Sequence, residues 1–183
     1  MLKHTLVATL LAVTAFAHAG TASIGFEADK FNSKTPADSF GLSVIPGYTF
    51  DNGITVDAKL QNTRVQPTGV ANSAEARVKK VFQFGAVGFG VRGGVGTVRA
   101  NGDNQSFYSV EPSLSYDLTS AITAEVSYKY TNTFKATNDG RTNTVYGGVA
   151  LKATPIDTFS AKVYRTTQDV DGTGVIVGYT RSF

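Results

Sequence analysis

The residues of this sequence that could do chemistry are charged side chains placed at every second position of short segments. Asp57 and Lys59, for example, alternate with Val56, Ala58 and Leu60. Strict alternation of this kind is typical of β-strands whose two faces meet different environments. Charged side chains on the inner face of a closed sheet can pair with one another or select ions along a water-filled path. The candidates for this role are Glu27, Lys59, Arg77, Lys79, Arg92, Glu111, Glu125 and Lys129.

Two interpretations of these inward charges remain open. The basic candidates come mainly from residues 59–92 and the acidic ones from residues 27 and 111–125, so a basic wall could face an acidic wall across a thin, water-filled path. In the alternative, the charges pair across a narrow interior and fill it. The wider set of expected inward charges adds Asp57, Glu75, Lys152 and Lys162. Small inward residues favour some open space, namely Gly88, Gly90, Gly94, Ser113, Ser115, Gly174 and Gly178.

The first 19 residues have the pattern of a secretory signal peptide. Lys3 gives a basic start, an apolar stretch runs from Leu6 to Phe16, and Ala17 and Ala19 form a small-residue cleavage site. A membrane-spanning helix needs about 20 apolar residues, which neither this stretch nor any later segment provides. We therefore expect an exported mature domain, residues 20–183, without a transmembrane helix.

Residue types on which many enzymes depend are missing from the expected mature domain. The chain has no cysteine or tryptophan, and its two histidines, His4 and His18, lie in the expected signal peptide. Ser–His and Cys–His nucleophiles, disulfides and histidine-based metal sites are therefore excluded. Asp169 and Asp171 are explained more simply by a solvated turn than by a Ca²⁺ site. We predict that the protein is not an enzyme and holds no cofactor or metal. A net charge of +3 at pH 7 is too small to indicate a nucleic-acid partner.

The mature sequence divides into alternating segments, which are the elements that must position these charges. They span residues 22–29, 40–50, 54–61, 74–84, 87–99, 108–116, 122–130, 145–151, 159–163 and 173–183. Alternating segments of about ten residues are the sequence signature of membrane β-barrels. We therefore predict an all-β fold: a transmembrane, antiparallel, up-and-down β-barrel of ten strands, or of eight if two weak segments merge. A soluble β-sandwich is the alternative fold.

The connections between the segments alternate in length. Long polar stretches cover residues 30–39, 63–73, 100–105, 132–141 and 168–172, whereas short turns cover 51–53, 85–86, 117–120 and 154–157. Long loops at one end and short turns at the other are typical of outer-membrane barrels. An even number of strands places both termini at the short-turn end, which we expect to be periplasmic.

Three residues on the apolar faces do not fit a regular strand. Lys80 interrupts an apolar row, for which we expect a bulge or slip, and Pro46 and Pro112 each lack a backbone donor, for which we expect a local bulge or a water contact. Aromatic residues near the segment ends are expected to form two girdles. The periplasmic girdle comprises Tyr48, Phe50, Phe82, Phe84, Phe89, Tyr116, Phe159 and Phe183, and the outer one Phe40, Tyr108, Tyr128 and Tyr130.

The last segment alternates apolar and small residues and ends on Phe183, four residues after Tyr179. This pattern resembles the closing strand of bacterial outer-membrane β-barrels, and the resemblance implies that the barrel-assembly machinery reads Tyr179 and Phe183. The hairpins at residues 50–60 and 116–130 resemble those of small monomeric porins, including the oligogalacturonate-specific porin family. The resemblance implies an integral protein of the Gram-negative outer membrane, surrounded by its lipid, and leaves a monomer and a homo-oligomer both open.

Together these patterns predict a narrow, passive, porin-like channel for ions or small polar solutes. The alternative is a non-conducting structural or surface-interaction barrel that works through its extracellular loops. Measuring whether the refolded protein conducts ions would separate the two.

Overall fold

The described part of the chain forms ten β-strands. The computed structural model describes residues 20–34, 38–66, 69–100, 102–135 and 140–183. Within them, no helix has the length and hydrophobicity to cross a membrane. The expected signal peptide, residues 1–19, lies outside the described residues. The strands are β1 (Gly20–Ser33), β2 (Ser39–Phe50), β3 (Ile54–Val65), β4 (Gly69–Phe84), β5 (Val87–Ala100), β6 (Asp103–Asp117), β7 (Ile122–Thr133), β8 (Thr142–Lys152), β9 (Asp157–Gln168) and β10 (Gly172–Ser182).

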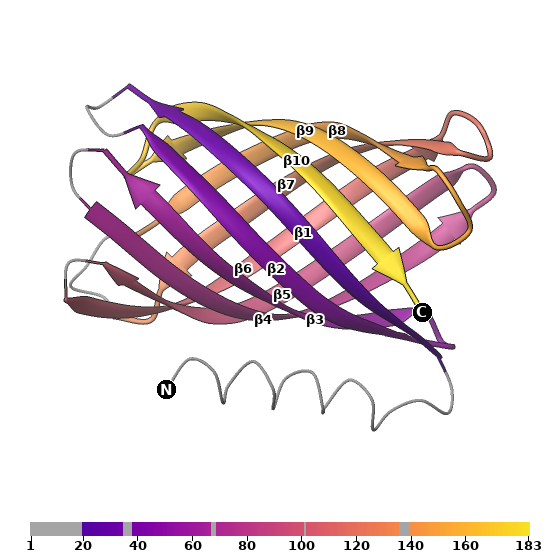
Figure 1. Cartoon of the computed structure of the whole chain (residues 1–183), viewed down its shortest axis with the longest axis horizontal. Coiled ribbons are helices and arrows are strands. Elements are labelled where there is room, and N and C mark those ends of the chain that lie inside the picture. The colour runs from indigo at the N-terminus through magenta and orange to yellow at the C-terminus, as the bar shows by residue number, and fades with distance from the viewer. Residues whose placement is uncertain (1–19, 35–37, 67–68, 101, 136–139) are drawn as a thin grey trace.

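The ten strands close into one barrel. Each strand pairs antiparallel with its neighbours in the chain, and β1 pairs with β10 to complete the circle. Figure 1 shows the strands winding obliquely around the barrel, with indigo β1 beside yellow β10. Ser23 pairs with Ser182, so β1 begins and β10 ends at the same end, which we call the terminal end; the opposite end is the far end. The prediction of ten strands is confirmed, and the count of eight is wrong.

The burial of side chains is inverted relative to that of a soluble protein. Large apolar side chains on the outer face are exposed, including Val78 at 51% and Leu114 at 51%. Among the described residues, only two large apolar side chains are buried, those of Tyr48 and Ile176. The other buried side chains are polar or charged. A β-sandwich would bury its apolar faces between two sheets. The single closed sheet, with its apolar face outward, excludes that alternative. The buried polar residues are Ser43, Glu75, Arg77, Ser109, Glu111, Ser127, Thr144 and Thr166.

Tight turns join the strands at the terminal end. Between β2 and β3, Gly53 has a φ of 75° and its N–H donates to the carbonyl of Phe50 at 2.8 Å. The side chain of Asn52 accepts a hydrogen bond from the N–H of Ile54 at 3.0 Å. Gly85, between β4 and β5, has a φ of 61°. Glycine adopts this left-handed backbone without the steric cost of a Cβ atom. The predicted turns at 51–53 and 85–86 are confirmed.

At the far end, the strands extend into stretches that the sequence predicts as loops. Residues 63–73 were expected to be a loop, but β3 continues to Val65 and β4 begins at Gly69. Asn62 faces Asn72 across this ladder, with a side-chain hydrogen bond of 2.7 Å. Polar side chains show that a segment lies in water, but the strand ladder uses backbone groups and continues beyond the apolar band. The difference in length between the two sets of connections is therefore smaller than predicted.

The bulges predicted at the two prolines are absent. Backbone pairing is interrupted on one side of each proline, between β2 and β3 and between β6 and β7, but it resumes without a shift in register. A missing N–H therefore removes ladder bonds without inserting an extra residue. The flanking pairs are Val44–Leu60 and Gly47–Asp57 around Pro46, and Val110–Tyr130 and Ser113–Ser127 around Pro112.

Lys80 also causes no bulge. It pairs with Ile54 on β3 and with Val91 on β5 in unbroken register. Its side chain extends along the outer face to the terminal end, where the ammonium group donates a hydrogen bond to the carbonyl of Asn52. The same group lies 5.9 Å from the ring centre of Phe82. A long lysine stem can cover apolar surface while its charge reaches a polar edge, so the strand needs no distortion.

Candidate functional site: the charged interior

All eight candidate residues lie on the inner face of the barrel, and the structure changes the wider set at two positions. Asp29 also faces inward, and its place two residues after Glu27 is the sequence signal that could have identified it. Lys152 keeps the inward parity of β8, but it lies exposed at the terminal end of the strand and joins none of the ion pairs of the described interior. The inward positions follow from the alternation of burial along each strand, because a closed sheet has only one enclosed side.

Each basic residue of the described interior is paired with a carboxylate. The sixth carboxylate, Asp29, accepts a hydrogen bond from the hydroxyl of Tyr164 at 2.8 Å. Among the described residues, six basic and six acidic side chains therefore take part in these interior contacts, and their formal charges balance. The N–O distances are 2.8 Å for Lys59–Glu27, 2.5 Å for Arg77–Asp57, 3.9 Å for Lys79–Glu125, 3.1 Å for Arg92–Glu111, 2.9 Å for Lys129–Glu75 and 3.5 Å for Lys162–Glu125.

Two of the ion pairs cross from β4 to β7 over the two strands between them. Glu75 on β4 accepts from Lys129 on β7, and Lys79 on β4 approaches Glu125 on β7. Glu75 also accepts a hydrogen bond from the hydroxyl of Ser109 on β6 at 2.5 Å. The carboxylate of Glu75 is therefore bonded from two strands, and these crossing pairs cover the inner surface of β5 and β6.

The inner glycines of β5 make room for these crossing side chains. A Cβ atom at Gly94 would lie 2.6 Å from Oε1 of Glu75, and one at Gly88 would collide with the hydroxyl of Ser115. Because a glycine has no side chain, the side chains of neighbouring strands can lie flat against the barrel wall at these positions. The sequence predicts open space above the small inward residues, but above these glycines the space is occupied by side chains from adjacent strands.

The expected basic wall facing an acidic wall does not form. The strands that bring most of the basic residues also bring Asp57 and Glu75, and the opposite strands bring Lys129 and Lys162. Acids and bases are thus interleaved around the interior, and the transverse field of two separate walls is absent. Arg77–Asp57 and Arg92–Glu111 join register partners on adjacent strands. The other pairs span one or more intervening strands and could not be identified from the sequence, because they depend on how the closed barrel brings those strands together.

A cavity of about 180 Å³ lies in the interior toward the terminal end. Charged groups of Glu27, Asp57, Arg77 and Arg92 line it together with small and hydroxyl residues. The Nε atom of Arg92 is buried and has no hydrogen-bond partner in the described protein. A water molecule takes about 30 Å³ in the liquid, so this cavity has room for several waters or a small solute beside the unpartnered Nε.

Aromatic rings occupy the interior toward the far end. The rings of Phe31 and Tyr164 stack with their centres 5.8 Å apart, and Tyr146 lies 5.4 Å from Tyr164. A Cβ atom at Gly174 would collide with the ring of Tyr164, and one at Gly172 with that of Phe31. Sequence reasoning missed this cluster, although Tyr164 shares its strand face with the inward Lys162.

Tyr179 and Phe183, the predicted assembly signal, both lie at the terminal end on the outer side. The hydroxyl of Tyr179 donates to Asp157 at 2.7 Å, and its ring lies 5.3 Å from that of Phe159. Phe183 is 71% exposed, and its backbone N–H donates to the carbonyl of Ala22 at 2.8 Å. The ring of Phe183 is therefore available to a partner.

Carboxylates outside the barrel wall serve local structure. Asp171 accepts from Lys34 at 2.7 Å, and Asp169 accepts from the backbone N–H of Arg141 at 2.7 Å. In the part of the chain that the structure describes, no group of three or more His, Cys, Asp or Glu residues could hold a metal ion.

Comparisons with known proteins identify the fold. No protein-family model matches the chain, and no curated protein matches it in sequence. Among solved structures, the KdgM porin is 15% identical, with a TM-score of 0.54 over 88% of this chain and 99% of that one. The β domain of the Bordetella autotransporter BrkA is 10% identical, with a TM-score of 0.62 over 90% and 100%. An outer membrane channel from Pseudomonas putida F1 is 8% identical, with a TM-score of 0.59 over 90% and 96%.

These likenesses show the fold of bacterial outer-membrane β-barrels. The resemblance to small outer-membrane porins that the hairpins predict is confirmed at this level. Barrels of porins, of a channel and of an autotransporter share the architecture, so the activity of this chain has to be argued from its own interior.

Proposed function

We propose that the protein is an integral outer-membrane barrel that acts as a narrow passive channel for ions or small polar solutes. The inverted burial is the observation that carries the membrane placement, because an exposed apolar outer face around a polar interior is stable only in lipid. With this placement the terminal end is periplasmic and the far end extracellular. Outer-membrane lipid then surrounds the barrel. The proposed role of the barrel is the passage of solutes, without a catalysed reaction.

The interior supports passage of small solutes with little preference for the sign of their charge. The six basic and six acidic side chains of the described interior balance, and the cavity that Arg92 lines leaves open space inside the barrel. Charged rings in a pore set selectivity, so a neutral interleaved set discriminates weakly. A non-conducting barrel is the second candidate, and it is favoured by a specific observation: each base of the described interior is held by a carboxylate, as expected where side chains fill a narrow barrel.

Planar-bilayer recordings of the refolded mature protein separate these two functions. Stable, discrete conductance steps are expected for the channel. Folding is checked in the same preparation by the shift in electrophoretic mobility between unheated and heated samples. Folded protein that gives no steps would overturn the channel and leave the non-conducting barrel.

Replacing Lys79 and Arg92 together by glutamine is expected to shift the ion selectivity severalfold toward cations. The two residues are register partners on β4 and β5, and their removal leaves an interior with two more acids than bases. The reversal potential under a salt gradient measures the change. Lys80→Gln, which removes a lysine from the outer face, is the matched control and should leave the reversal potential unchanged. An unchanged potential in the double variant would place both residues outside the path.

Replacing Phe183 by alanine is expected to reduce severalfold the amount of barrel found in the outer membrane of cells. The proposed reason is that the assembly machinery recognises the exposed terminal ring. Phe84→Ala is the matched control, since Phe84 lies at the same end and is 69% exposed against 71% for Phe183. Both rings belong to the expected periplasmic girdle, so the two changes should lower the free energy of unfolding by similar amounts, which vesicle unfolding of both variants checks. Equal amounts of the two variants in the membrane fraction would contradict recognition of Phe183.

A further inference from the structure

Cations gather on the outer face of the barrel near its far end. Four odd-numbered strands each carry one exposed, outward basic residue within their last four positions. No carboxylate stands on the outer face of any described strand in that half of the barrel, because the strand acids there point inward. The far end therefore presents a positively charged outer rim. Its residues are Lys30 on β1, Arg64 on β3, Arg99 on β5 and Arg165 on β9.

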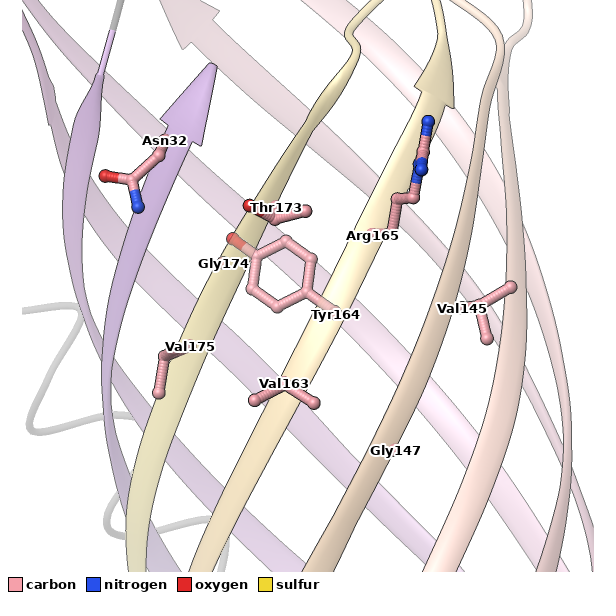
Figure 2. Close-up of a pocket in the computed structure, with 9 residues that line it drawn as sticks. All are labelled: Asn32, Val145, Gly147, Val163, Tyr164, Arg165, Thr173, Gly174 and Val175. Atoms are coloured by element: carbon pink, nitrogen blue, oxygen red, sulfur yellow. The ribbon is translucent and has the colours of Figure 1, made fainter. Parts of the chain in front are cut away.

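An apolar groove lies on the same outer face, beside two of these cations: Arg165 lines it, and Lys30 is the register partner of Val175, which also lines it. It has a volume of about 470 Å³ and runs over β8, β9 and β10, where Val145, Val163 and Val175 line it. Figure 2 shows these residues on neighbouring strands, with Arg165 and Asn32 toward the same end of the groove. Gly147 forms part of the lining, and a Cβ atom there would meet nothing within 4 Å. The groove is thus a hollow left where an outer side chain is missing.

The two flanking cations are close enough to share one small anion. Arg165 pairs in register with Thr173 of β10, and Lys30 pairs with Val175 of the same strand. Two strand spacings and two residue rises place their Cα atoms about 12 Å apart, which two long side chains can bridge through a phosphate.

Both cations have charge left for a ligand. The Arg165 side chain is 59% exposed, and its nearest described carboxylate, Asp171, is 3.8 Å away. Asp171 is already held by Lys34, whose hydrogen bond keeps the pKa of Asp171 below its ordinary value. Arg165 and Asp171 thus form an ion pair about as loose as the 3.9 Å pair of Lys79 and Glu125, which leaves the exposed Arg165 only partly compensated. Lys30 is exposed and has no carboxylate partner among the described residues.

We propose that this surface binds one phosphorylated lipid of the surrounding leaflet, with an acyl chain in the groove and a phosphate between Lys30 and Arg165. The proposal rests on the membrane placement argued above. A lipid is the occupant because the groove opens onto the apolar outer face. A phosphate is its headgroup because four cations stand on that rim and no strand acid faces outward beside them, although Asp171 of the β9–β10 connection offsets part of the charge of Arg165. Basic patches at the headgroup level of membrane proteins bind anionic lipids in this way.

Native mass spectrometry of the refolded protein in micelles tests the site. The probe is bisphosphorylated lipid A, and its phosphate-free form is the comparison. We expect one molecule of the phosphorylated probe to be retained. Replacing Lys30 and Arg165 together by glutamine should weaken retention about 30-fold, since each basic residue near a lipid headgroup contributes roughly a 5-fold factor. Gly147→Leu, which fills the groove and keeps both charges, should also weaken retention.

Lys80→Gln is the matched control, because it removes an outward cation from the terminal end of the barrel. It should retain the probe as the unchanged protein does. Three results would each overturn the site: retention by the Lys30/Arg165 double variant equal to that of the unchanged protein, equal loss in the Lys80 variant, or displacement of the probe by millimolar inorganic phosphate. Heat-modifiable mobility of each variant in vesicles reports membrane folding separately, so failure of the lipid site is distinguishable from failure of the membrane placement.

Discussion

Replacing Val78 by arginine is expected to lower the free energy of unfolding in lipid vesicles by about 2–4 kcal/mol, the cost of an arginine on the lipid face of a barrel at mid-membrane. Val78 lies in the middle of β4, on the outer face, and is 51% exposed. On a soluble protein, a substitution at a position this exposed changes stability by less than about 0.5 kcal/mol. The size of the loss therefore measures whether hydrocarbon surrounds the barrel.

Val70→Arg supplies the matched control on the same strand. Val70 is the second residue of β4, at the far end, and is 47% exposed. The penalty for arginine falls to about 0–1 kcal/mol near the membrane surface. Repulsion from Arg64, the register partner of Val70, adds at most about 1 kcal/mol, so this variant should lose less stability than Val78→Arg. Because the chain has no tryptophan, guanidinium unfolding is best followed by circular dichroism. Equal small losses for the two variants would contradict the membrane placement.

The architecture could be predicted from the sequence because its signal is local. Alternation between Asp57 or Lys59 and their apolar neighbours depends only on the period-two geometry of a strand, and the turn at Asn52-Gly53 depends on residues that tolerate a left-handed backbone. Such patterns give the strand count, the inner face and the positions of the terminal-end turns. They also place the eight candidate charges inside the barrel, because residues at alternate positions along a strand point to the same face of the sheet.

The errors concern features that depend on the closed barrel rather than on one segment. Residues 63–73 are polar because they lie beyond the apolar band, but their backbone still pairs, so hydrophilic composition was a poor guide to loops. Lys80 keeps its register by reaching Asn52 on another hairpin. Likewise, Glu75 meets Lys129 only because β4 and β7 face each other over the glycine-rich β5. No spacing within the sequence encodes such a pair.

Glu75→Gln is expected to lower the free energy of unfolding by about 3 kcal/mol or more. Removing one partner of a buried ion pair leaves the other charge without compensation, which costs about 3–5 kcal/mol. The side chain of Glu75 is 6% exposed and that of Lys129 is 18% exposed, so little water can replace the lost carboxylate. Adding Lys129→Gln should recover a large part of the loss. A double-mutant cycle, followed by guanidinium unfolding in vesicles, measures the coupling.

Glu125→Gln makes the same chemical change at looser pairs. Its carboxylate is 3.9 Å from Lys79 and 3.5 Å from Lys162, and both lysines are partly solvated, so the loss should be about 1 kcal/mol. Equal losses for the two glutamates would show that pair geometry does not set stability here.

The same Glu75 variant also bears on whether solutes pass the ion pairs or are stopped by them. If the pair that crosses from β4 to β7 blocks the axis, its loss should raise the conductance of single barrels. If the path instead runs through the cavity lined by Glu27, Asp57 and Arg77, conductance should stay the same while anions gain, because Lys129 is left unpaired. A rise in conductance would mean that the intact ion pair closes the barrel. An unchanged conductance would mean that the unaltered protein can conduct with all its ion pairs in place.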